Sequence, residues 1–82
     1  MKETIIGELK KWGVSTVVPW DFRNQNDFRN RLDVGQKVEF DRCIEEMEKQ
    51  GILIPRLKTT TEDGQIIDYY LSEKGINVVY VL

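Results

Sequence analysis

The chain has 82 residues, with 12 Lys and Arg against 14 Asp and Glu, and a formal net charge of −2. A chain of this length builds one hydrophobic core, so we expect a single domain over residues 1–82. Hydrophobic residues make up 40% and charged residues 32%, a balance typical of globular rather than disordered proteins. No apolar run approaches the roughly 18 residues that span a bilayer, and residues 1–4 precede no signal-peptide core. These features predict a cytoplasmic protein without a membrane partner.

The single cysteine, Cys43, and the absence of histidine limit the chemistry of this chain. They exclude an internal disulfide and a Cys/His zinc site. Cys43 falls in register with the apolar positions Phe40, Ile44 and Met47, so we expect a thiol in the core or at its boundary. The sequence also has no serine in a nucleophile context and no glycine-rich phosphate loop. It therefore predicts no enzyme, no metal and no cofactor.

An amphipathic first helix is predicted over Thr4–Trp12. Its apolar stripe has the spacing i, i+1, i+4, i+7 and consists of Ile5, Ile6, Leu9 and Trp12. Gly13 follows as a C-terminal stop. The β-branched segment Val14–Val18 suits either a short strand or an extended link into Pro19.

The segment from Trp20 to Asp33 combines aromatic residues with a polar cluster. The aromatic side chains are expected to pack in the core. Asn24–Asp27 is typical of a loop or a helix cap. We therefore predict a turn, a polar loop and a short second helix from about Asp27 to Leu32, capped by Asn26 or Asp27.

A third helix is predicted from Val34 to about Gln50. Asp33 and Gln36 have the spacing of a capping box at its start. Gly51 ends it, because glycine adopts the left-handed conformation without penalty. Its inward face is formed by Phe40, Ile44 and Met47, with Cys43 alongside.

A β-hairpin is predicted after this helix, with strands at Ile52–Leu57 and Gln65–Leu71 and a turn at residues 61–64. Pro55 has to lie on an edge strand or at a bulge, because it donates no backbone hydrogen bond. The tail from Ile76 to Leu82 forms either a helix capped by Ser72 or a strand, and its β-branched residues favour the strand.

An uncovered apolar tail would expose an aggregation-prone edge. The tail therefore pairs within the domain or meets a second copy of the chain, and we favour pairing within the domain. One core is expected to contain Ile5, Leu9, Trp12, Phe40, Ile44, Met47, Leu53 and Leu71.

Three motifs together resemble the winged-helix regulators of the MarR type. They are the helix end Gly51-Ile52-Leu53, the turn Glu62-Asp63-Gly64 and the exit Tyr70-Leu71-Ser72-Glu73-Lys74-Gly75. In that family a Gly-Leu-Ile corner leads into a wing, whose second strand often ends in Leu-Thr-Glu-Lys-Gly. The match covers about half of the chain. It implies an α+β, winged-helix fold, with a three-helix helix-turn-helix core and a β-hairpin wing, and DNA binding in transcription regulation.

The sequence departs from this family at three places. The third helix carries more acidic than basic residues: Glu39, Asp41, Glu45, Glu46 and Glu48 against Lys37, Arg42 and Lys49. A helix with this excess of acidic residues is repelled by the phosphates that flank a major groove unless the acidic side chains point away. The predicted wing tip has Glu62 and Asp63 but no arginine. Only a short tail follows Gly75, whereas MarR-type dimers are made by long terminal helices.

Six basic residues form the candidate site for double-stranded DNA. Arg29, Arg31 and Lys37 bracket the turn between the second and third helices, where a helix-turn-helix lies near one phosphate backbone. Arg42 is the candidate base reader. Arg56 and Lys58, at the base of the wing, could face the other backbone. In the alternative interpretation these six side chains are solvated counter-charges.

Two functions therefore follow from the sequence. The first is a small winged-helix DNA-binding protein, a transcription regulator or accessory factor. The second is a winged-helix protein-interaction module that does not bind DNA, with a protein partner or a second copy of the chain. The acidic third helix, the acidic wing tip and the net charge of −2 favour the second.

Overall fold

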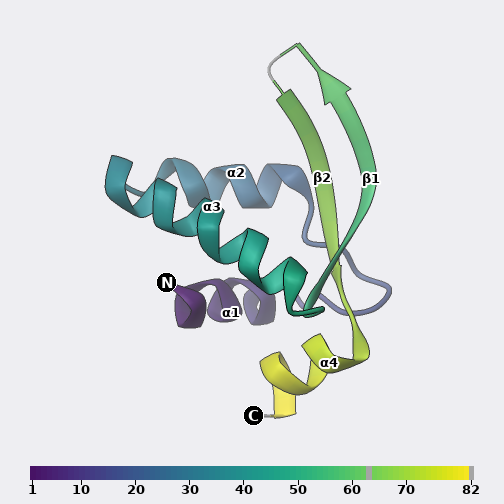
Figure 1. Ribbon diagram of the computed structural model, residues 1–82. Coiled ribbons are helices and arrows are strands. Elements are labelled where there is room, and N and C mark those ends of the chain that lie inside the picture. The colour runs from purple at the N-terminus through teal and green to yellow at the C-terminus, as the bar shows by residue number, and fades with distance from the viewer. Residues whose placement is uncertain (63, 82) are drawn as a thin grey trace.

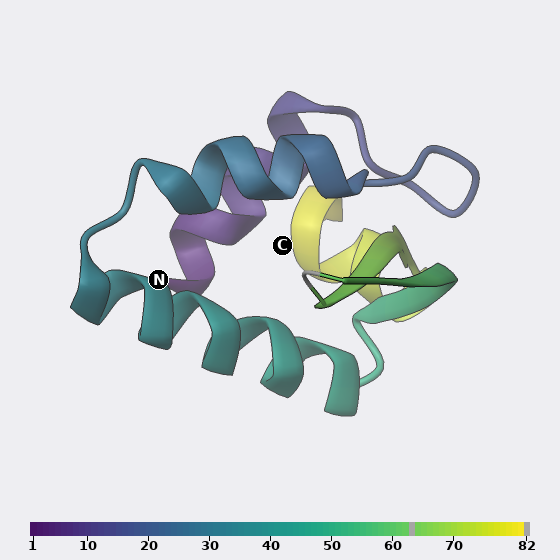
Figure 2. The same cartoon turned by 90° about the horizontal axis from the view of Figure 1, so that it is seen from above.

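The computed structural model describes residues 1–62 and 64–81, and the side chains among them except those of residues 57–61 and 64–66. The elements are α1 (Lys2–Lys11), α2 (Phe22–Asn30), α3 (Val34–Lys49), β1 (Leu53–Thr61), β2 (Gly64–Leu71), α4 (Glu73–Ile76) and the π-helical η1 (Asn77–Val81). The fold is α+β, as predicted, with one antiparallel hairpin among the described residues. Figures 1 and 2 show α2 and α3 side by side, with α1 beneath them and the hairpin at one end of the pair.

The first helix buries the predicted face but not its last member. Ile5 and Leu9 are fully buried, and Gly13 ends the helix with φ of 60°. The prediction for Trp12 is wrong, because its side chain is 43% exposed. Trp12 is the C-cap residue of α1, and its indole Nε1 donates to Glu8 at 3.0 Å on the helix surface.

Residues 14–18 form no strand, and they are not an extended link either, because the chain bends at residues 16–18. The Ser15 hydroxyl accepts hydrogen bonds from the amides of Val17 and Val18, at 3.1 and 3.0 Å. Beyond this bend, Trp20 forms an antiparallel bridge with Tyr69 of β2. The Trp20 amide donates to the Tyr69 carbonyl at 2.7 Å, and the Tyr69 amide donates back at 3.1 Å. The chain between α1 and α2 is thereby joined to the hairpin.

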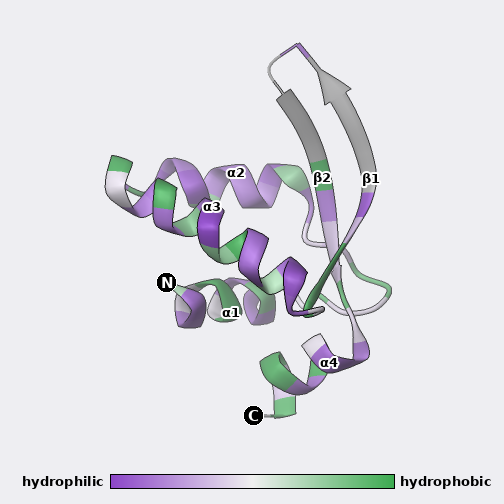
Figure 3. Ribbon diagram, in the orientation of Figure 1, coloured by the Kyte–Doolittle hydropathy of each residue, from purple (hydrophilic) through white to green (hydrophobic). Residues whose placement is uncertain are grey.

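The predicted boundaries of the second helix are wrong at both ends, because α2 spans Phe22–Asn30. Asp21 is the N-cap, and its carboxylate accepts from the Asn24 amide at 2.8 Å. The cap was therefore expected five to six residues too late. The polar cluster that resembled a loop lies inside the helix, which Figure 3 draws largely in the hydrophilic colour.

Two bonds to β2 explain why this polar segment is helical. The Phe22 amide donates to the Asp68 carboxylate at 3.0 Å. The Gln25 side-chain nitrogen donates to the carbonyls of Trp20 and Ile67, each at 2.8 Å. Asp68 thus satisfies one free amide of the first turn, the Gln25 side chain ties this turn to β2, and together they override the local preference of asparagine for loops.

The prediction for the third helix is confirmed. The Gln36 amide donates to the Asp33 carboxylate at 2.8 Å, and the Asp33 amide donates to the Gln36 side chain at 3.2 Å. Gly51 follows the helix with φ of 76°. The inward residues Phe40, Ile44 and Met47 are buried. Cys43 is half-buried at the boundary of the core, as expected.

The hairpin is longer than predicted but has the expected pairing. Leu53 lies opposite Leu71 and Pro55 lies opposite Tyr69, and the register shifts between Arg56 and Thr59. Trp20 occupies the other side of β2. Pro55 therefore lies on the edge strand, as its missing amide requires. The predicted turn residue Asp63 lies outside the described residues.

The strand favoured for the C-terminal tail is wrong, because residues 73–81 are helical. The Ser72 hydroxyl caps this segment by accepting from the Gly75 amide at 2.9 Å. Val79 is 1% exposed, and the Tyr80 hydroxyl donates to the Val14 carbonyl at 2.7 Å. The local cap outweighs β-branched propensity, and the tail packs within the domain against α1, as favoured. Leu82 lies outside the described residues.

The predicted core residues, apart from Trp12, belong to one cluster. Its members are Ile5, Leu9, Val14, Trp20, Phe28, Phe40, Ile44, Met47, Ile52, Leu53, Tyr69, Leu71 and Val79. The rings of Phe28 and Phe40 lie 5.5 Å apart and join α2 to α3. Among the described helices, none is long and apolar enough to cross a membrane.

Two glycines provide a matched test of this packing. A Cβ atom on Gly75 would collide with the Ile52 carbonyl oxygen, whereas one on Gly7 would meet nothing within 4 Å. We expect Gly75→Ala to lower the free energy of unfolding by about 1–3 kcal/mol. Gly7→Ala should raise it by about 0.5–1 kcal/mol, because alanine is the better helix former. Urea unfolding at low protein concentration measures both, and equal effects of the two variants would contradict this packing.

Candidate nucleic-acid interface

Arg29, at the end of α2, is held by an acidic residue of α3. Its Nε and Nη2 atoms lie 3.0 and 2.9 Å from the two carboxylate oxygens of Asp41. The hydrogen bond to Asp41 raises the pKa of Arg29 further above its ordinary value. Lys37 precedes Asp41 by one helical turn, so the two share one side of α3. The structure therefore brings Arg29 and Lys37 to the same side of the α2–α3 pair.

Arg31 is directed toward α1 instead. Its Nη2 atom lies 3.6 Å from a carboxylate oxygen of Glu8, and its Nε donates to the Asp27 carbonyl at 3.2 Å. Its guanidinium carbon lies 5.9 Å from the centre of the Phe28 ring. These contacts place Arg31 as a counter-charge between α2 and α1, apart from the ion pair of Arg29.

The remaining candidates are spread over α3 and the hairpin. Arg42 is exposed, but it follows Lys37 by five residues and so lies about 140° around α3 from it. Arg56 is exposed on β1, with its guanidinium 5.3 Å from the centre of the Tyr70 ring. The side chain of Lys58 lies outside the described residues. No single described face therefore gathers all the candidates.

The outward side of α3 also carries acidic and apolar groups. Glu39 and Glu46 are exposed, and Glu45 pairs with Lys49 at 3.4 Å. Val34 and Val38, one turn apart, are 80% and 56% exposed. Sequence reasoning missed these two valines, although their i, i+4 spacing away from the buried stripe was visible. Two exposed valines so close together are unusual for a helix that only faces water.

Tyr69 is the most perturbed ionisable group in the described part of the chain. Tyr69 is 6% exposed, and its hydroxyl donates to the Glu48 carboxylate at 3.5 Å. Burial first, and the adjacent Glu48 charge second, raise the pKa of Tyr69 to about 12. Its backbone also holds Trp20, so this tyrosine joins α3, β2 and the link before α2. No local sequence signal predicts this contact, because Glu48 lies 21 residues away.

Among the described residues, no three Cys, Asp or Glu side chains come together as metal ligands.

We compared this chain with known protein families, curated proteins and solved structures. No protein-family model, no curated protein and no solved structure matches this chain. The MarR-type resemblance therefore stays a prediction from sequence motifs.

The perturbed tyrosine predicts how stability depends on alkaline pH. An unfolded tyrosine loses its proton near pH 10. From there to about pH 12 the folded protein keeps a proton that the unfolded chain has lost, so the free energy of unfolding falls as pH rises. Tyr69→Phe removes this loss. Denaturant unfolding at about pH 9 and pH 11 should therefore show a wild-type stability that declines relative to Tyr69→Phe. The same difference at both pH values would show that Tyr69 titrates normally.

Proposed function

We propose that this chain is a winged-helix domain that binds double-stranded DNA through α3, the end of α2 and the hairpin. The order of the elements supports this: a helix, the Trp20 bridge, two helices and then a hairpin that pairs with the bridge. The inner face of α3 is buried, and its outer face is open to solvent beside the hairpin (Figure 1). A helix held in this way is free to enter a major groove.

The observation that carries the proposal is that Arg29 and Lys37 lie on the same side of the α2–α3 pair, on either side of Asp41. Arg29 is bound to Asp41, but both side chains are partly exposed, at 37% and 55%. Such a surface ion pair contributes only about 0–1 kcal/mol. A backbone phosphate can therefore replace Asp41 as the partner of Arg29.

The remaining exposed basic residues take different roles in this proposal. Arg42 projects from the outer side of α3 and reads a base edge, preferably guanine, which a guanidinium binds through two hydrogen bonds. Arg56 approaches the backbone from the hairpin. Arg31 faces Glu8 of α1 and is left out of the interface.

The proposal is tested by fluorescence anisotropy with a random duplex pool over a range of salt concentrations. We expect weak binding that falls steeply with salt. Arg29→Ala should reduce the slope of log affinity against log salt by about one, equally for all sequences. Arg42→Ala should relax sequence preference selected from the pool. Arg31→Ala serves as the matched control and should leave the slope unchanged.

Asp41→Asn should change the affinity for DNA in the opposite direction to Arg29→Ala. It keeps the shape of the side chain while removing the charge that competes with phosphate for Arg29. We expect this variant to bind the duplex pool more tightly than the wild type. Weaker binding would show that Asp41 positions Arg29 for DNA, and unchanged binding would remove Arg29 from the interface. A folded, monodisperse wild type that leaves the pool unbound at about 20 mM salt contradicts DNA binding altogether.

The exposed Val34 and Val38 favour a second candidate, a protein-interaction module. Asp41 and Glu45 follow Val38 by three and seven residues and share its side of α3, so the matching partner surface is apolar at its centre and basic at its rim. A photo-crosslinker at position 38 tests this function. Cross-linking to one defined protein that is lost in Glu45→Lys supports the module, and cross-linking unaffected by this change contradicts it.

A further inference from the structure

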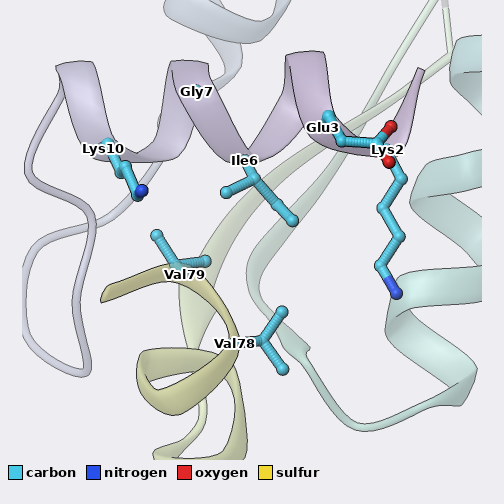
Figure 4. A pocket seen from close by; sticks show the side chains of 7 residues that line it. All are labelled: Lys2, Glu3, Ile6, Gly7, Lys10, Val78 and Val79. Carbon is cyan, nitrogen blue, oxygen red and sulfur yellow. The ribbon is translucent and has the colours of Figure 1, made fainter. Parts of the chain in front are cut away.

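One face of α1 carries a regular pattern of charged, apolar and small residues. Glu3, Ile6, Gly7 and Lys10 follow one another at i, i+3, i+4 and i+7, so they lie on one side of the helix. Together with Lys2, Val78 and Val79 they line a groove of about 460 Å³ between α1 and η1. Figure 4 shows Ile6 and Val79 pointing into this space from opposite sides, with Lys10 at one end.

Gly7 is unexpected at the centre of this face. A glycine inside a helix costs about 0.5–1 kcal/mol relative to alanine. A Cβ atom at this position would meet nothing within 4 Å, so the packing of the domain itself does not require glycine. A small residue at an open helix position permits close approach by another backbone or side chain. No described atom of this chain approaches that position, so a second molecule is the source we consider.

The charges on either side of Gly7 are self-complementary. Glu3 lies toward the start of α1 and Lys10 toward its end, about 10.5 Å apart along the axis. A second α1 placed antiparallel, with a two-fold axis between Ile6 and Gly7, sets Glu3 of each copy opposite Lys10 of the other. The same symmetry sets Ile6 of each copy against Gly7 of the other. Such a surface, which matches itself, is the requirement of an isologous dimer.

We propose that the chain forms a two-fold homodimer through antiparallel contact of the two α1 helices. Ile6 of the second copy occupies the groove over Gly7 and Val78. The two Glu3–Lys10 pairs at its ends set the register. Figure 1 shows α1 beneath α2 and α3, on the side away from the hairpin, so this contact leaves α3 and the hairpin uncovered. The inference is independent of the proposed function.

Sedimentation equilibrium of charge variants tests the register directly. Glu3→Lys turns both attractive pairs into repulsive ones, and we expect the dimer dissociation constant to rise about tenfold or more. The double variant Glu3→Lys with Lys10→Glu exchanges the charges and should restore the dimer. Glu39→Lys makes the same charge reversal on α3 and serves as the control that leaves the mass unchanged.

Gly7→Leu tests the close approach separately from the charges. Its side chain projects into open space, so the monomer should keep its circular dichroism spectrum and melt no lower than the wild type at low protein concentration. The mass at high concentration should fall to that of the monomer. A wild type that stays monomeric up to about 1 mM overturns the proposal. So does a dimer that survives both Glu3→Lys and Gly7→Leu, because its interface then lies elsewhere.

Discussion

Trp20 is the residue on which the arrangement of this molecule depends. Its backbone pairs with Tyr69 of β2, and its fully buried ring lies 6.1 Å from that of Phe40 on α3. Its carbonyl also accepts from the Gln25 side chain in the first turn of α2. The link after α1, the hairpin and the two longer helices are therefore joined at one position. A helix pair alone would leave the hairpin unattached, since a two-stranded hairpin in water is at best marginally stable.

The charged residues around α2 and α3 show how the same contacts can stabilise the fold and limit its function. The Arg29–Asp41 pair, with two hydrogen bonds, supports the packing of α2 on α3. It also lowers the positive potential that a phosphate backbone would meet. The proposed DNA-binding function thus rests on an exchange of partners at Arg29. The competing protein-interaction function rests on the exposed valines of α3. Removing a nearby acidic charge should strengthen DNA binding in the first case and weaken binding of the protein partner in the second.

The two proposed surfaces lie on different sides of the domain. One uses α3, the end of α2 and the hairpin, and the other uses the free face of α1. A two-fold contact through α1 would present two copies of α3 related by the same axis, which doubles any contact that each copy makes. Both surfaces depend on small local features: an ion pair on one side, and a glycine that the fold does not require on the other.

The sequence by itself determined those elements whose signals are local. The capping box at Asp33, the glycine at residue 51 and the buried stripe of α3 are all encoded within a few residues, and the structure has them where they were expected. At the start of α2 the Asp21 cap is local, but tertiary structure adds the contacts with β2, in which the Phe22 amide donates to Asp68 and the Gln25 side chain donates to the Ile67 carbonyl. Tertiary structure also decided which basic residues are paired. Arg29 meets Asp41 twelve residues away and Arg31 meets Glu8 on α1, and only packing of helices can bring such groups together. The exposed Trp12 and the helical tail differ from these cases, because their contacts are local: the Trp12 indole donates to Glu8 one turn earlier, and Ser72 caps the tail.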